Sequence, residues 1–149
     1  ERAGKPRKVL EVGCGAGAGL NFLSRWEPGS TFVGLDLSQE VVNAANARFS
    51  RPPALTYVQG DAEALPFPDG EFDVLLDVES SHNYPNVPQF FREAARGLKP
   101  GGCFVHVDLV TDAGDIAIER GRQQTKQLFD WGEQEDISES VRAAAELRG

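Results

Sequence analysis

The chain is 149 residues long and has 15 basic against 23 acidic side chains, a formal net charge of -8. This length suits one domain with its own core, and the acidic balance argues against a nucleic-acid partner, which would need clustered Lys and Arg. No apolar run approaches the roughly 20 residues of a membrane span, and the charged start lacks the apolar stretch of a signal peptide. We therefore expect one cytoplasmic domain over residues 1–149.

Cysteine and methionine content adds two expectations. The two cysteines, Cys14 and Cys103, are too few for a disulfide framework or for a metal site of their own, so we expect no metal ion. The chain contains no Met, and its last segment, 143–149, has the composition of an interrupted helix. We expect a domain that is truncated at both ends.

Short apolar and β-branched runs predict five strands: Lys8 to Cys14, Thr31 to Leu37, Leu55 to Gly60, Phe72 to Glu79 and Cys103 to Val110. Two helices are predicted between them. One covers Ser38 to Phe49, with Ser38 as its cap, and the other begins at Val87 with Pro88 in the first turn. Alternating strands and helices predict a doubly wound α/β fold with a mostly parallel sheet.

The pattern is weaker after residue 110, where we expect a helical part over 111–149. Helices are predicted over Asp115 to Phe129 and Ser138 to Leu147, with Trp131 to Ile137 as either a short acidic strand or a loop.

A glycine-rich loop follows the first predicted strand. Residues 9–19 read Val-Leu-Glu-Val-Gly-Cys-Gly-Ala-Gly-Ala-Gly. Glycine allows positive φ angles and brings a ligand against bare backbone, and the N-terminus of the next helix favours an anionic group. The pattern is typical both of nicotinamide or flavin dinucleotide binders and of S-adenosylmethionine (SAM) methyltransferases. Asp36, near the end of the second predicted strand, suits a ribose hydroxyl in either class.

Three further features favour SAM. Glu11 lies two residues before the first glycine, where dinucleotide-binding folds usually have an apolar residue and a methionine amino group would need an anion. Asp61 follows the third predicted strand, where it can accept a hydrogen bond from an adenine amino group or, alternatively, simply start a turn. The segment 97–102, Gly-Leu-Lys-Pro-Gly-Gly, forms a tight turn before the fifth predicted strand.

With these blocks in this order, residues 8–110 resemble the class I SAM-dependent methyltransferases. The resemblance implies a Rossmann-like fold, SAM as cofactor and S-adenosylhomocysteine as product. It also implies cofactor contacts from the ends of the first three strands: Gly13, Gly15 and Gly17 beneath the methionine and ribose, Glu11 near the amino group, Asp36 on the ribose, Asp61 with Ala62 at the adenine, and Leu37 in the same pocket.

The segment after the fourth predicted strand, 77–86, opens into the crevice at the carboxyl ends of the strands. Methyl transfer needs mainly positioning, but an acceptor that holds its proton tightly, such as an alcohol, also needs a base. His82 is the preferred catalytic base, and a loop histidine that only bonds the backbone is the alternative. We expect His106 to be a core histidine, with a substrate contact as the alternative. Asp108 is a weaker base candidate, and Tyr84 either orients an acceptor or packs under the loop.

The acceptor is predicted from the same loop. It lacks the Asn/Asp-Pro-Pro-Tyr/Phe signature of methyltransferases that act on nucleobases or amide side chains. Residues 79–85, Glu-Ser-Ser-His-Asn-Tyr-Pro, and the acidic segment 135–138 are instead similar to bacterial phthiotriolone and polyketide O-methyltransferases. This likeness implies a small apolar metabolite methylated at a hydroxyl oxygen. The alternatives are carbon methylation of a lipid or prenyl-type substrate, a nicotinamide-binding oxidoreductase domain, and a non-catalytic SAM-binding module that acts by interaction.

Overall fold

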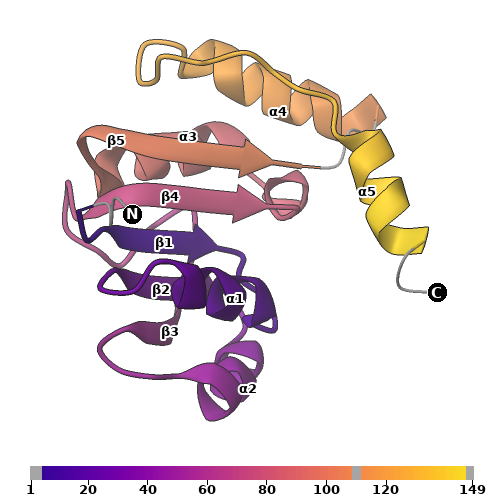
Figure 1. The fold of residues 1–149 in the computed structure, drawn as a ribbon. Helices are drawn as coiled ribbons and strands as arrows, with labels where there is room; N and C mark the ends of the chain where they lie inside the picture. The colour runs from indigo at the N-terminus through magenta and orange to yellow at the C-terminus, as the bar shows by residue number, and fades with distance from the viewer. Residues whose placement is uncertain (1–4, 109–111, 147–149) are drawn as a thin grey trace.

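A parallel sheet forms the centre of the computed structural model, which describes residues 5–108 and 112–146. Its strands are β1 (Lys8–Val12), β2 (Thr31–Asp36), β3 (Leu55–Gln59), β4 (Phe72–Val78) and β5 (Leu98–Val107). They are arranged in the order β3-β2-β1-β4-β5, and each neighbouring pair is parallel (Figure 1). The predicted α/β fold with a parallel sheet is confirmed.

Helices cover both faces of this sheet. They are α1 (Ala18–Trp26), α2 (Gln39–Phe49), α3 (Val87–Gly97), α4 (Asp112–Gln124) and α5 (Ser138–Glu146), with a short 3-10 helix, η1 (Ser81–Asn83), after β4. Apolar side chains of α1 and α2, including Leu20 and Val42, share one buried cluster with Val9 of β1. Side chains of α3 share a second cluster with Leu10 and Leu75. Because Val9 and Leu10 are consecutive in a strand, the two clusters lie on opposite faces.

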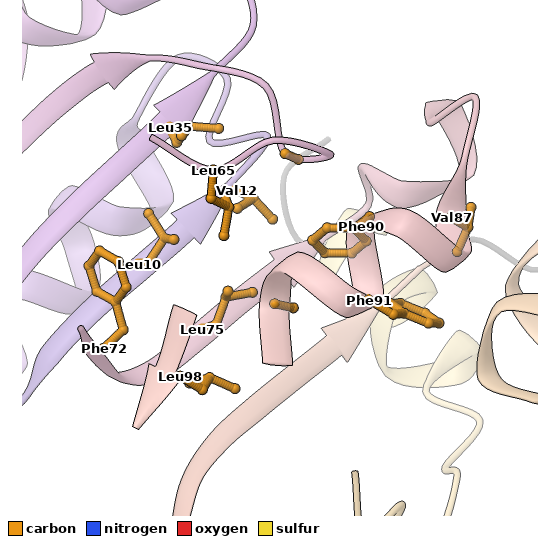
Figure 2. Packing of buried hydrophobic residues seen from close by; sticks show 12 residues of the cluster. Leu10, Val12, Leu35, Leu65, Phe72, Leu75, Val87, Phe90, Phe91 and Leu98 are labelled. Atoms are coloured by element: carbon orange, nitrogen blue, oxygen red, sulfur yellow. The ribbon is translucent and has the colours of Figure 1, made fainter. Parts of the chain in front are cut away.

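Helix α3 shows how the sequence builds one of these layers. Asn86 caps its N-terminus by accepting a hydrogen bond from the Gln89 backbone N–H at 3.2 Å, and Pro88 lies in the first turn. Phe90 and Phe91 are fully buried on the side that faces the sheet (Figure 2). Each aromatic ring removes a large apolar area from water, so this face anchors the helix.

The structure differs from the prediction at the start of β5. The strand begins at Leu98, although a tight turn is predicted there and a strand only from Cys103. The turn residues are accommodated as an irregularity within the strand, because the β4–β5 register shifts between Phe72 and Val74 and Gly101 has a φ of 77°. Residues 109 and 110 of the predicted strand lie outside the described residues.

The C-terminal part follows the prediction more loosely. Helix α4 ends at Gln124 rather than at the predicted Phe129. Thr125 directs its side-chain hydroxyl to the Gly121 carbonyl oxygen at 2.7 Å, a bond that competes with continued helix. Residues 131–137 have no regular structure, in agreement with the loop alternative. No helix in the described ranges combines the length and apolar character needed to cross a bilayer. The domain limits and the cytoplasmic location stay predictions.

Candidate active site

The sheet places the candidate site at the carboxyl ends of its strands. The chain runs outward from β1 through β2 to β3, and then returns to the other side of β1 with β4 and β5. The strand order therefore reverses between β1 and β4, which is where open α/β sheets leave a crevice for a ligand. The arrowheads in Figure 1 mark this edge.

The glycine loop between β1 and α1 is held tightly from both sides. Gly13 has a φ of 60°, and an added Cβ there would lie 2.4 Å from the Cβ of Ser80. Gly17 has a φ of 76°, and its added Cβ would lie 2.6 Å from the Tyr57 ring. Both positions therefore require glycine for conformation as well as for space. The Tyr57 hydroxyl also donates a hydrogen bond to the Gly17 carbonyl oxygen at 2.7 Å.

Asp36 connects this loop to the end of β2. One carboxylate oxygen accepts a hydrogen bond from the Gly15 N–H, and the other accepts one from the Ser38 N–H, each at 3.0 Å. Because each carboxylate oxygen can accept more than one hydrogen bond, these contacts still permit bonds to ribose hydroxyls. The adjacent Leu37 side chain is 69% exposed, which leaves an apolar surface beside the carboxylate.

Glu11 lies beneath the loop and is only 9% exposed. Burial, and to a lesser extent the charge of Asp77, raises the pKa of Glu11 from 4.5 to about 7. Its Oε2 has no hydrogen-bond partner within the described part of the chain. A buried carboxylate oxygen without a donor is costly. It is suited to a cationic ligand group that arrives from the crevice.

Asp61 and Ala62 follow β3 at the same edge of the sheet. Asp61 Oδ1 accepts a hydrogen bond from the Glu63 N–H at 2.8 Å, so this residue has the turn-forming role that the sequence allowed. Ala62 is buried. The Gly60 N–H bonds the Asp36 carbonyl oxygen at 3.0 Å, which places this turn beside the end of β2. The contact of Asp61 with adenine stays a prediction.

His82 is paired with Asp108 across the ends of β4 and β5. The ring Nδ1 lies 2.5 Å from Asp108 Oδ1, and the His82 backbone N–H donates to Asp108 Oδ2 at 2.9 Å. The imidazole is 26% exposed and the carboxylate only 3%. His82 thus has access to the crevice, while Asp108 lies behind it. The structure gives Asp108 the position of an orienting carboxylate rather than that of the base.

A second cluster behind this pair includes residues that the sequence analysis did not single out. Asp77 and His106 are register partners on β4 and β5, and Asp108 lies two residues after His106, so all three project from the same face. His106 Nε2 lies 3.2 Å from Asp77 Oδ2, and the Ser81 hydroxyl lies 2.8 Å from the same nitrogen. His106 is mostly buried, as predicted. The signal for Asp77 is a charged residue inside an apolar strand.

Tyr84 lies between the glycine loop and the loop that contains His82. Its hydroxyl lies 2.8 Å from Ser80 Oγ and would lie 3.1 Å from a Cβ added at Gly13. Its ring packs edge-on against Phe90. Burial raises the pKa of the Tyr84 hydroxyl far above its ordinary value, so it stays protonated. The loop that contains His82 is therefore in direct contact with the glycine loop.

Comparison with known proteins identifies the family to which this arrangement belongs. The methyltransferase domain family matches residues 10–106. The chain belongs to this family. Over 102 residues it is 48% identical to the fatty-acid O-methyltransferase of Mycolicibacterium smegmatis, covering 68% of this chain and 37% of that protein. Over 103 residues it is 47% identical to the phthiotriol/phenolphthiotriol dimycocerosates methyltransferase of Mycobacterium tuberculosis, covering 69% of this chain and 38% of that one.

A solved S-adenosylmethionine-dependent methyltransferase from Mesorhizobium loti has the same fold, with a TM-score of 0.61 and 29% identity over 68% of this chain and 46% of that chain. The methyltransferase domain described here spans 37–38% of the length of the two curated relatives above. Its membership confirms the resemblance seen in the sequence and argues against a nicotinamide-dependent oxidoreductase. The roles of individual site residues stay predictions.

Proposed function

We propose that this methyltransferase domain binds SAM at the carboxyl ends of β1, β2 and β3 and directs its methyl group to the hydroxyl oxygen of a small lipid-like molecule. His82 acts as the base. The observation that carries this proposal is the pairing of a partly exposed imidazole with a buried carboxylate, in a loop that touches the glycine loop.

The residues present fit the cofactor. Glu11 has a buried carboxylate oxygen without a donor, which suits the amino group of the methionine moiety. Asp36 can accept hydrogen bonds from ribose, and Leu37 offers an exposed apolar side chain to the adenine. When bound, SAM supplies a methyl group that is already activated by the positive charge on sulfur. The protein then has to position the acceptor and take up its proton.

The His82–Asp108 pair favours a hydroxyl over a carboxyl acceptor. A fatty acid is ionised at neutral pH and attacks without a base, whereas an alcohol must lose a proton as the new bond forms. A positioned imidazole contributes roughly 10²- to 10⁴-fold to such a proton transfer. One relative is named as a fatty-acid O-methyltransferase and the other as a phthiotriol/phenolphthiotriol dimycocerosates methyltransferase, so lipid-related substrates occur among the named relatives. The paired imidazole supports the alcohol here.

Calorimetric titration with SAM, S-adenosylhomocysteine and NAD in parallel tests the cofactor. We expect micromolar binding of both adenosyl ligands and none of NAD. Binding of NAD instead, or binding of neither adenosyl ligand, contradicts the proposed cofactor. The exposed variant Glu133→Gln serves as the matched control for the site variants, because it changes one exposed carboxylate that has no assigned role in the site.

Cetyl alcohol and palmitic acid, which have the same chain length, separate the two oxygen acceptors. Product analysis by mass spectrometry should show the methyl ether as the main product. His82→Gln should lower its formation by about 10²- to 10⁴-fold without changing SAM affinity. Equal activity of the variant removes His82 from the mechanism. A methyl ester as the main product shows that a carboxylate is the acceptor, and a methyl group on carbon supports the C-methyltransferase alternative.

A further inference from the structure

A chain of hydrogen bonds runs from His106 on β5 to His82. It connects the His106 ring, the Ser81 hydroxyl and the carboxylate of Asp108 before it reaches the His82 imidazole. The carboxylate of Asp77 lies beside the buried end of these bonds, with Oδ2 3.2 Å from His106 Nε2 but without a hydrogen bond to it. Asp77 and Ser81 are fully buried. Because little water can exchange partners here, each proton must lie where the protein groups place it.

The Ser81 hydroxyl fixes the direction of this chain. It has one hydrogen, and its oxygen lies 2.6 Å from Asp108 Oδ2 and 2.8 Å from His106 Nε2. An ionised carboxylate can only accept hydrogen bonds, so the hydroxyl donates to Asp108. The same oxygen must then accept from His106, whose Nε2 therefore carries a proton. The carboxylate of Asp77, 3.2 Å from this nitrogen, favours a proton there as well.

At the His82 end of this series of hydrogen bonds, donors and acceptors follow the same direction. Asp108 Oδ1 accepts from His82 Nδ1, so the proton of His82 lies on Nδ1 and the lone pair on Nε2. The Asn83 side-chain amide donates to this lone pair at 2.9 Å. Both oxygens of Asp108 are thus held by donors, Oδ1 by the ring and Oδ2 by Ser81 and the His82 backbone N–H.

We propose that Ser81 and His106 are positioning residues for the methyl transfer, because they hold Asp108 in the orientation that keeps the proton of His82 on Nδ1. The acceptor hydroxyl takes the place of the Asn83 amide at Nε2, and the lone pair there receives its proton. In the same step the bond from the acceptor oxygen to the methyl carbon forms, and the bond from that carbon to the sulfur of SAM breaks. This step gives an imidazolium whose charge is balanced by Asp108. The inference rests on the proposed role of His82, but its main readout is independent of activity.

Nitrogen NMR tests the proton positions directly, because the chain contains only two histidines. Long-range 1H–15N spectra of the full chain should show the Nδ1–H form for His82 and a protonated Nε2 for His106. An unprotonated Nε2 on His106 overturns the proposal. That state is the one that a metal ion would require, since the ligand atoms of Asp77, His106 and Asp108 lie within 4.8 Å of one another.

Three variants test the coupling. Ser81→Ala removes the connecting hydroxyl, and we expect His82 to show both tautomers and the turnover of cetyl alcohol to fall about 10- to 100-fold, with SAM affinity within about twofold. His106→Leu should have the same effects. His106→Gln retains an N–H donor near the position of Nε2, so it should restore most of the turnover and the Nδ1–H form of His82. Ser140→Ala, on the exposed side of α5, is the control.

The outcomes separate this inference from the proposed function. If His82 keeps its tautomer in both Ser81→Ala and His106→Leu, the relay does not position it and the inference is wrong, whatever the activity. If His106→Gln and His106→Leu show the same His82 tautomers and the same turnover, the hydrogen bond donated by residue 106 does not position His82. That result also overturns the inference. If the tautomers respond as expected but His82→Gln retains full turnover, the proposed base is wrong while the hydrogen-bond relay stands.

Discussion

Replacing Glu11 by Gln is expected to stabilise the ligand-free fold while it weakens cofactor binding. Burial, followed by the charge of Asp77, raises the pKa of Glu11 from 4.5 to about 7. At about 1.4 kcal/mol for each pH unit, this rise corresponds to about 3 kcal/mol in the free energy of unfolding. Gln has nearly the same shape but no charge, so the variant avoids this cost.

The direction follows from proton linkage. The unfolded chain releases the Glu11 proton near its ordinary pKa of 4.5, whereas the folded chain retains it until about pH 7. The stabilisation that comes from the retained proton is complete below pH 4.5. It is lost progressively as the pH rises to 7, and the free energy of unfolding stays lower above that value. Glu11→Gln cannot ionise and should lack this part of the pH dependence.

Urea unfolding followed by tryptophan fluorescence measures the effect. At about pH 8.5 Glu11→Gln should exceed the wild type by up to about 3 kcal/mol, and at about pH 4.5 the two should be nearly equal. Glu133→Gln, at an exposed position, should change stability by less than about 0.5 kcal/mol. SAM affinity at the higher pH should fall about 10- to 100-fold in Glu11→Gln, because a hydrogen bond between charged groups contributes about 1.5–3 kcal/mol.

Either of two results would refute this reasoning. If Glu11→Gln is no more stable than the wild type at the higher pH, burial of the ionised carboxylate carries no cost. If the variant binds SAM as tightly as the wild type, the orphaned oxygen does not receive the amino group of the cofactor. Wild-type SAM affinity should also rise as the pH increases through 7, and a flat profile would contradict the same assignment.

Three further variants test the site and the core. Asp36→Ala should weaken SAM binding by roughly 1–3 kcal/mol in calorimetric titration, and an unchanged affinity removes Asp36 from the ribose site. Gly17→Ala should lower the free energy of unfolding by at least about 1–2 kcal/mol, because its Cβ would lie 2.6 Å from the Tyr57 ring. Gly132→Ala, where a Cβ meets nothing within 4 Å, is its control. Phe90→Ala should cost about 3–5 kcal/mol in urea unfolding, and a much smaller loss would show that the α3 layer repacks around the missing ring.

The fold could be predicted because its signals are local. Each strand is a short apolar run, and the two predicted crossover helices, α2 and α3, each have an apolar face and a capping residue, Ser38 and Asn86. The start of β5 could not be predicted in this way. The segment Lys99 to Gly102 has the composition of a turn. It lies within β5 only because β4 pairs with Leu98 before it and with Cys103 after it, with a shifted register between the two pairs. The pairing partner, rather than local preference, decides such boundaries.

The candidate site also combines residues that local sequence reveals with residues that only strand pairing brings together. The glycine loop and Asp36 are visible in the sequence, because backbone conformation and strand ends are marked by residue type. The pairing of His82 with Asp108 is not visible in the sequence, because the two residues are 26 positions apart. They meet only because β4 and β5 are adjacent and in parallel register. Once that adjacency is known, Asp77, His106 and Asp108 follow from side-chain alternation along the two strands.

The contact between the two loops has a consequence for how the site assembles. Ser80 Oγ bonds both Asp77 and the Tyr84 hydroxyl, and it lies 3.4 Å from the Val12 carbonyl oxygen at the entrance to the glycine loop. A shift of Gly13 would therefore displace the residue that directly precedes Ser81 and the hydrogen-bond relay to His82. Because the glycine loop and the base share these contacts, a cofactor that shifts the loop would also shift the imidazole. A cofactor that fits the loop as it stands would leave the base in its position beside the acceptor.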